Sequence, residues 1–298
     1  MPVLALDIGG TKLAAALVDD DGTVLQSARR PTPAEPWPAC VALLEEVAGA
    51  ARVDGVGAGC GGPMRWPDGV VSPLNMPSWR DFSLRQRLAE RWPGRPVRVH
   101  NDAVCVAVGE HWRGAGRGVD DLLGVVVSTG VGAGVVLGGR VLDGSTGSAG
   151  HLGHVVVEPD GPACGCGGRG CLEAVARGPA VVERARAAGC AVRDGLELAE
   201  LARAGDEIAR AELARAGRAL GTGFASAAAL LDLRHVVVGG GLAQAGAPLW
   251  GPLHTAVATH ARLPFTRGLR VVPAVLGAHA GLVGAAALVI DRRYWSAD

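Results

Sequence analysis

The chain has 298 residues, enough for one large or two ordinary domains, and 49% of them are hydrophobic against 19% that are charged. This balance predicts a sizeable core and excludes wholesale disorder. Lys+Arg and Asp+Glu are equal at 29 each, which makes nucleic acid and acidic membrane surfaces poor candidate partners.

The first half of the chain alternates strand and helix patterns. Val3–Ile8 and Leu13–Val18 are apolar runs of strand length that flank a turn at Gly9–Thr11, and a third run starts at Thr23. This arrangement predicts a β-hairpin or meander. The elements expected next are a helix over Trp37–Ala51, a strand over Val53–Gly59, a helix over Leu84–Trp92, a strand over Val97–His100 and a helix over Ala103–Trp112 with Asp102 as its N-cap.

The second half restarts the same plan. A strand is expected over Leu122–Ser128, followed by a Gly-rich turn over Thr129–Gly134 and a strand over Val135–Leu137. The later elements are a helix over Glu207–Leu231, strands over Arg234–Val238 and Leu269–Pro273, and a closing helix over Ala280–Arg292. The alternation predicts an α/β architecture, the repeated plan indicates two similar halves, and residues 114–118 are the candidate linker.

The first Gly-rich turn, Asp7–Lys12, has the ingredients of a polyphosphate site. Glycine lets backbone N–H groups approach phosphate oxygens, Thr11 offers a hydroxyl, and Lys12, the only lysine in the chain, offers a compact positive charge. Asp7, at a strand end, can hold Mg²⁺ through water. The spacing is not that of a P-loop, and a plain hairpin turn is the alternative.

Two further glycine clusters are candidate nucleotide contacts. The turn Ser128–Gly134 stands in a strand context like that of the first turn, which suggests that a phosphate chain is held by both. Gly239-Gly240-Gly241 follows a strand, where backbone could pack against a flat ligand such as adenine. A dinucleotide-binding fingerprint is the competing interpretation there, but its third glycine is missing at the required spacing.

A histidine and three cysteines form a candidate metal site: His154, Cys164, Cys166 and Cys171 occupy eighteen residues. One imidazole and three thiolates complete a tetrahedral shell for Zn²⁺, and a filled shell indicates a structural site. The alternative is that these residues pack as small hydrophobes or stay as free thiols. The other four cysteines lie in apolar segments and are expected in the core.

Asp102 is the candidate catalytic carboxylate. It follows Asn101 at a strand-to-helix junction, where a carboxylate can face a cleft and accept a proton from a hydroxyl that attacks a phosphoryl group. A helix N-cap is the alternative role. The phosphate-type turns on either side of it in the sequence favour the catalytic one.

No targeting or membrane segment is expected. The N-terminal stretch lacks a basic region and meets a charge at Asp7, and no apolar run reaches about 18 residues. Seven cysteines, an odd number, in a long chain without a signal peptide indicate reduced thiols and a cytoplasmic location.

Five motifs resemble, in their order, the ROK family of sugar kinases and repressors. They are Asp7–Lys12 (DIGGTK), Asn101-Asp102, Ser128–Gly134 (STGVGAG), Gly150–His154 (GHLGH) and Cys164–Glu173 (CGCGGRGCLE). The resemblance runs over nearly the whole chain. It implies an actin-like, ribonuclease H-like (ASKHA) α/β fold with a cleft between two domains and a structural zinc loop. The implied domains are residues 1–113 with a returning helix at about 281–298, and residues 114–280.

The resemblance also implies an activity and residue roles. The protein would be an ATP-dependent kinase of the 6-hydroxyl of a hexose or N-acylhexosamine, with ATP, Mg²⁺ and structural Zn²⁺, and a homo-oligomer, dimer or tetramer. Asp102 would be the base. The residues that would hold the sugar are Asn75, Asn101, His151, His154 and Glu173. The residues that would contact the nucleotide are Gly9, Gly10, Thr11, Lys12, Thr129, Gly130, Gly239, Gly240 and Gly241. Trp79 would lie near Asn75, where the family closes the sugar site.

Two residues depart from the family pattern. Most family glucokinases have glutamate where this chain has His151, and a histidine can donate as well as accept a hydrogen bond. Together with the likeness of Ala149–His154 and Leu4–Leu17 to bacterial N-acetylmannosamine kinases, this favours an N-acylhexosamine over glucose. Arg177 replaces a common serine, with no clear effect on nucleotide contacts.

Two other function classes compete with the kinase. The family's repressors carry an N-terminal helix-turn-helix, and only six residues precede Asp7 here, so a regulator lacking its DNA-binding domain is the alternative. A chaperone-like or sensor ATPase of the same superfamily is the other, and the zinc loop and the sugar-type residues argue against it.

Overall fold

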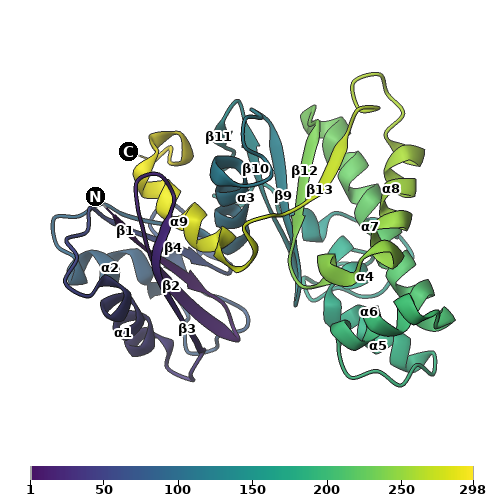
Figure 1. The fold of residues 1–298 in the computed structure, drawn as a ribbon, viewed down its shortest axis with the longest axis horizontal. Helices are drawn as coiled ribbons and strands as arrows, with labels where there is room; N and C mark the ends of the chain where they lie inside the picture. The colour runs from purple at the N-terminus through teal and green to yellow at the C-terminus, as the bar shows by residue number, and fades with distance from the viewer. Residues whose placement is uncertain (1, 298) are drawn as a thin grey trace. The chain divides into compact units, whose positions relative to one another are not determined.

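The computed structural model describes residues 2–297 and divides the chain into two compact units (Figure 1). Unit 1 runs to Asp120 and also contains Gly134–Gly150 and the chain from Val275 onward. Unit 2 consists of Asp121–Ala133 and His151–Ala274. Among the described residues, no helix is both long and apolar enough to cross a bilayer.

Unit 1 is built on a five-stranded sheet of order β3-β2-β1-β4-β8. The strands are β1 (Val3–Ile8), β2 (Lys12–Val18), β3 (Val24–Pro31), β4 (Val56–Cys60) and β8 (Val97–Asn101), with a small antiparallel sheet of β5 (Met64–Arg65), β6 (Val70–Val71) and β7 (Phe82–Ser83). β1 is antiparallel to β2 and parallel to β4, and β4 is parallel to β8. The expected hairpin and meander are therefore confirmed.

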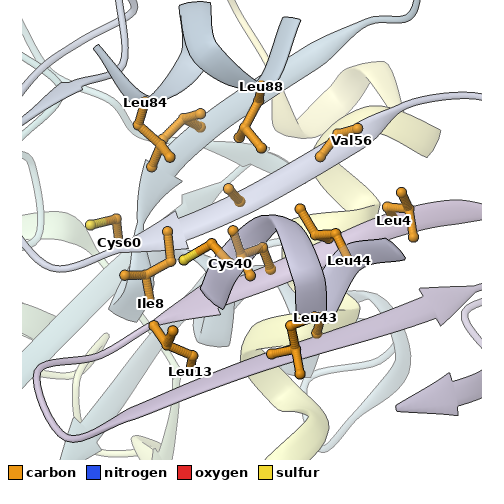
Figure 2. Packing of buried hydrophobic residues seen from close by; sticks show 14 of the residues in the cluster. Leu4, Ile8, Leu13, Cys40, Leu43, Leu44, Val56, Cys60, Leu84 and Leu88 are labelled. Carbon is orange, nitrogen blue, oxygen red and sulfur yellow. The ribbon is translucent and has the colours of Figure 1, made fainter. Parts of the chain in front are cut away.

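Both faces of this sheet are buried, and strand alternation decides which side chain joins which core. Leu4, Leu6 and Ile8 of β1 pack with α1 (Pro36–Ala48) and α2 (Leu84–Arg91), as Figure 2 shows for part of this cluster. The intervening Val3 and Ala5 pack instead with α3 (Asp102–Arg113) and α9 (Ala280–Ile290). Because a slip of one residue would exchange the two sets, the register of the hairpin is tightly specified.

Helices α3 and α9 pack with their backbones in contact. A Cβ added to Gly284 would lie 1.6 Å from the carbonyl oxygen of Cys105, and one added to Gly109 would lie 2.2 Å from that of Ala280. Only glycine fits at these two positions. The C-terminal helix is thereby fixed against the helix that begins with Asp102.

Unit 2 contains the parallel strands β9 (Leu122–Val127), β12 (His235–Gly239) and β13 (Arg270–Pro273), with β12 in the middle. Its helices are α4 (Leu172–Ala176), α5 (Gly178–Ala187), α6 (Gly195–Ala204), α7 (Glu207–Leu231) and α8 (Ala247–His260). Gly217 and Gly221 of α7 lie against the α8 backbone, since a Cβ on either would come within 2.4 Å of a carbonyl oxygen of α8. Four short 3-10 helices complete the described elements: Leu152–His154, Leu242–Ala245, Gly277–His279 and Arg292–Tyr294.

The two five-stranded sheets share one strand pattern. β10 (Val131–Leu137) begins in unit 2 and ends in unit 1, where it pairs with β11 (Arg140–Val141). The sheet order β11-β10-β9-β12-β13 repeats β3-β2-β1-β4-β8, with the first strand of each set in the middle. The expected repeat of one α/β plan is confirmed.

Some boundaries differ from the sequence-based expectation. The N-cap of α3 is Asn101, whose side chain accepts a hydrogen bond from the N–H of Ala103, so the assignment of Asp102 as N-cap was wrong. β10 begins at Val131, inside the expected Gly-rich turn, because its small residues pair as a strand. The expected closing helix ends at Ile290 and is followed by a separate 3-10 turn.

Candidate functional site

The turn between β1 and β2 carries the first candidate phosphate contacts. The N–H of Gly9 donates to the carbonyl oxygen of Lys12 at 3.0 Å and closes the turn. Thr32, directly after β3, supports it, because its hydroxyl donates to the carbonyl oxygen of Gly9 at 2.7 Å and its N–H donates to that of Thr11 at 3.1 Å. Thr11 and Lys12 are exposed, so the hydroxyl and the ammonium are available to a ligand.

Asn75 lies directly on this turn. A Cβ added to Gly10 would come within 2.3 Å of the Asn75 amide nitrogen, so only glycine lets the two segments meet. Arg80 organises the loop that carries Asn75, because its guanidinium donates to the carbonyl oxygens of three residues of that loop, Pro73, Met76 and Trp79, at 2.8–3.0 Å. Trp79 is buried and stacks on Phe82, with ring centroids 4.1 Å apart, so it serves the core.

Asp102 stands at the first turn of α3, directly after β8. Its Oδ1 accepts a hydrogen bond from the N–H of Ala103 at 2.8 Å. A Cβ added to Gly61 would meet only Oδ2 of Asp102, at 4.0 Å, so a small volume beside this carboxylate is left open. The carboxylate is therefore oriented at the start of α3, and Gly61 leaves room beside it.

A buried network holds the strand that ends at Asn101. Nδ1 of His100 accepts from the N–H of Asn101 at 2.8 Å, so its Nε2 carries the hydrogen and donates to Asp143, also at 2.8 Å. Asp143 in turn accepts from the hydroxyl of Ser296 at 2.6 Å. No motif marks this support, because its members are separated by up to 196 positions.

Asp7 lies at the end of β1 and its carboxyl group is strongly perturbed. Burial, and next the negative charge of Asp102, raise the pKa of Asp7 to about 6 from 3.8, while the positive charge of Lys12 opposes the shift. Two carboxylates and one ammonium thus share this part of unit 1. The excess negative charge is the setting in which a divalent cation binds.

We expect Asp7→Asn to stabilise the ligand-free protein above pH 6. A carboxyl group whose folded pKa is raised favours folding when protonated, and this contribution is lost as the pH rises from about 4 through 6. At about 1.36 kcal/mol per pH unit, the gain from the substitution approaches an upper limit of about 3 kcal/mol at pH 7–8 and vanishes near pH 4.

Urea unfolding across this pH range measures the difference between Asp7→Asn and wild type. Six of the seven tryptophans (Trp37, Trp66, Trp79, Trp92, Trp112 and Trp295) lie in unit 1, so their fluorescence reports on that unit. If the difference in unfolding free energy between the two proteins does not change with pH, the pKa of Asp7 is not raised and the prediction is wrong.

In unit 2, the four candidate zinc ligands come together. One ligand atom from each of His154, Cys164, Cys166 and Cys171 lies within 4.8 Å of all the others. Nδ1 of His154 is 3.7 Å from Sγ of Cys164, and Sγ of Cys166 is 3.7 Å from Sγ of Cys171. Zn–S bonds of about 2.3 Å and Zn–N bonds of about 2.0 Å in a tetrahedron place ligand atoms about 3.6–3.8 Å apart, so the cluster fits zinc.

Glu173 and the second Gly-rich turn contact each other. Oε2 of Glu173 accepts a hydrogen bond from the N–H of Val131 at 2.9 Å, and a Cβ added to Gly130 would lie 2.7 Å from the same oxygen. Glu173 therefore holds the turn, with Oε1 left for other partners. The rings of His151 and His154 are nearly parallel, with centroids 6.4 Å apart.

A pocket of about 640 Å³ opens in unit 2 beside this turn. Its lining combines the Gly-rich turn, the first turns of α5 and α6 and the segment after β12: Ser128, Thr129, Gly178, Pro179, Val182, Glu183, Arg186, Arg193, Asp194, Gly195, Leu196, Ala199, Gly241, Leu242, Gln244 and Ala245. Of the residues that the sequence proposed for the nucleotide in this unit, Thr129 and Gly241 line the pocket. The contributions of α5 and α6 were missed, because no motif marks them.

Gly240 shapes the end of β12. Its φ of 93° lies in the left-handed region, and a Cβ there would come within 2.2 Å of the carbonyl oxygen of Val127. Glycine alone permits this close approach of the segment after β12 to the end of β9. Gly240 therefore has a structural role, while Gly241 reaches the pocket wall.

Comparison with known proteins identifies relatives over nearly the full chain. The ROK family model matches residues 3–292. The chain is 35% identical to a glucokinase of Thermotoga maritima over 98% of both chains, and 39% identical to an N-acetylmannosamine kinase of Escherichia fergusonii over 82% of this chain and 85% of that one. The structure of a ROK family glucokinase from Streptomyces griseus, in complex with glucose and AMPPNP, matches with a TM-score of 0.85 at 33% identity, covering 97% of this chain and 99% of that one. Both the match to the family model and the level of identity show that the chain belongs to the ROK family.

Proposed function

We propose that the protein is an ATP-dependent kinase that transfers the γ-phosphoryl group to the 6-hydroxyl of a hexose or N-acylhexosamine, with N-acetylmannosamine favoured. The observation that carries this proposal is the place of Asp102: its carboxylate is held at the start of α3, close enough to Asp7 that its charge raises the pKa of that carboxyl, in the part of unit 1 that also holds Lys12. The names of the relatives, glucokinase and N-acetylmannosamine kinase, support the reaction class.

In the proposed reaction, Asp102 accepts the proton of the attacking hydroxyl. The hydroxyl oxygen forms a bond to the γ-phosphorus, the bond from that phosphorus to the bridging oxygen breaks, and ADP leaves with the electron pair. Such a base contributes about 10²–10⁴-fold to the rate. Asn101, Asn75, His151, His154 and Glu173 are the proposed sugar ligands.

The β1–β2 turn is the proposed partner of the transferred phosphoryl group. Gly9 closes the turn, Gly10 and Thr11 offer backbone N–H groups, and the Thr11 hydroxyl and the Lys12 charge complete the proposed phosphate contacts. Asp7 is the residue that would hold Mg²⁺, which supplies charge neutralisation on the phosphates when bound. The raised pKa of Asp7, close to Asp102, supports this role because its carboxylate lacks a full positive counter-charge.

The pocket of unit 2 is the proposed nucleoside site. Its volume of about 640 Å³ suits a nucleotide, and Val182, Leu196 and Leu242 supply apolar wall for a flat base. Thr129 and Gly130 are the proposed phosphate contacts, with Gly239, Gly240 and Gly241 beside the adenosine. The zinc site orders the loop that carries His154 and leads into Glu173.

A panel of sugars tests the function and its specificity together. Purified protein with ATP and Mg²⁺ is assayed on glucose, N-acetylmannosamine, N-acetylglucosamine, mannose, fructose and allose. If N-acetylmannosamine gives the highest kcat/KM, the full proposal is supported. If glucose gives the highest kcat/KM, the protein is a glucokinase. Sugar binding without phosphorylation of any sugar would overturn the kinase and favour a sugar-responsive regulator.

We expect His151→Glu to move preference toward glucose. A carboxylate only accepts hydrogen bonds, so it suits sugar hydroxyls and disfavours an acetamido carbonyl, whereas imidazole can donate to that carbonyl. A change of one such contact alters the kcat/KM ratio by roughly 10-fold or more. His151→Gln, which keeps a donor, is the matched control and should keep the N-acyl preference. Equal sugar preference in all three proteins would remove His151 from specificity.

A further inference from the structure

Glu110 is a fully buried carboxylate on the last turns of α3. It accepts hydrogen bonds from three backbone N–H groups: those of Ala115 at 2.9 Å, Val275 at 3.1 Å and Leu276 at 2.9 Å. Three backbone donors therefore converge on this one side chain. No part of the proposed reaction uses it.

The three donors lie near two of the four places where the chain passes between the two units, the first exit from unit 1 and the last return to it. The chain leaves unit 1 after Asp120, shortly beyond Ala115, and it returns to unit 1 at Val275. One carboxylate therefore binds the first outgoing and the last returning segment (the two crossing segments). Their donors Ala115 and Val275 are 160 positions apart in the sequence.

Neighbouring residues reinforce this junction. His111 donates from Nε2 to the carbonyl oxygen of Val119 at 2.7 Å, and its Nδ1 accepts from the hydroxyl of Tyr294, also at 2.7 Å. Gly114 is obligatory, because a Cβ there would lie 2.0 Å from Oε2 of Glu110. The end of α3 is thus shaped to hold the two crossing segments.

We propose that Glu110 is a positioning residue of the phosphoryl-transfer reaction, whose carboxylate fastens both crossing segments to the helix that begins with Asp102. This inference rests on the proposed function, since that reaction needs a donor bound in unit 2 and a base in unit 1. With about 1.5 Å of rise per residue, α3 is a rigid rod of about 12 Å between Asp102 and Glu110. Glu110 therefore fixes the position of the two crossing segments relative to Asp102.

Glu110→Gln tests the proposal with little change in shape. Each oxygen of Glu110 accepts from at least one N–H, Oε1 from Val275 and Leu276 and Oε2 from Ala115, so the amide NH₂ must face a donor on one side. We expect kcat to fall roughly 10- to 100-fold, the scale of a small misplacement of reacting groups. The Kd of AMPPNP, whose proposed pocket lies within unit 2, should stay within about twofold, since its lining is untouched.

Val108→Ala is the matched control, because it weakens the buried face of the same helix without touching the crossing segments. Both variants are assayed at a temperature where circular dichroism shows them fully folded. An equal loss of kcat in both would reduce Glu110 to a structural residue and overturn the proposal. Glu110→Asp, which keeps the charge on a shorter arm, should recover part of the lost kcat and serves if Glu110→Gln does not fold.

Amide hydrogen exchange gives a readout that does not depend on activity. The N–H groups of Ala115, Val275 and Leu276 should exchange slowly in wild type and at least about 10-fold faster in Glu110→Gln. If wild type phosphorylates no sugar, the proposed function fails. The hydrogen-exchange measurement still decides whether Glu110 holds the crossing segments. Unchanged exchange would overturn the inference even if the kinase activity is confirmed.

Discussion

Asp102→Asn should lower kcat by about 10²–10⁴-fold while the protein stays folded and binds sugar. The amide keeps an oxygen that can accept from the N–H of Ala103, so the start of α3 is preserved. What is lost is the negative charge that takes the proton of the attacking hydroxyl. Steady-state kinetics together with sugar binding by calorimetry separate these effects, because the loss should appear in kcat and not in the sugar Kd.

Asp206→Asn is the matched control for this substitution. Asp206 caps α7 in unit 2, where its Oδ1 accepts from the N–H of Ala209 at 2.8 Å, and asparagine caps equally well. Its kcat should equal that of wild type. Turnover near the wild-type level in Asp102→Asn would remove Asp102 from the mechanism and with it the main support of the proposed function.

Removal of one zinc-site thiol should abolish metal binding and destabilise the loop it holds. Wild type is expected to contain about one zinc per chain, and Cys171→Ser less than roughly a tenth of that, because three ligands hold zinc far more weakly than four. The loop has two isolated β-bridges, and Cys164 and Cys171 pack with Ala174 in a small cluster. With so small a core, metal binding must supply much of its folding free energy.

The stability and the sugar affinity should fall together in this variant. Loss of a site saturated about 100-fold above its Kd removes about 2.7 kcal/mol, which lowers Tm by roughly 5–11 °C for a chain of this size. Cys190→Ser, a buried thiol of unit 2 outside the cluster, should keep its zinc and its sugar Kd. Zinc-free wild type in elemental analysis, or an unaltered zinc content in Cys171→Ser, would refute the structural site.

Much of the fold follows from local patterns. The expected helix Glu207–Leu231 has the same limits as α7, because Asp206 caps it and its small apolar residues recur at helical spacing. The actin-like α/β fold that the sequence resemblance implied is shared with the ROK kinases of known structure. The domain limits at residues 113 and 280 stay a prediction. Helix α8 was missed because Pro252 lies inside it, and proline argues against a helix interior.

The candidate site was predictable where residues adjacent in sequence act together. The zinc ligands and the β1–β2 turn are of this kind, since their spacing alone limits the geometry. Glu110 shows the opposite case: a glutamate in a helix is usually a solvated surface residue, and its burial depends on N–H groups 165 positions away. Arg80 was missed for the same reason, because its acceptors are backbone carbonyls that any sequence would provide.

The contact between α3 and α9 has a consequence for how the polypeptide is made. Leu282, Val283 and Leu288 complete one of the two cores of unit 1, yet they follow all of unit 2 in the chain. Domains usually fold in the order in which they leave the ribosome. Here unit 1, which begins before unit 2 in the chain, must wait for α9, so its nascent core stays exposed while all of unit 2 emerges and has time to fold first.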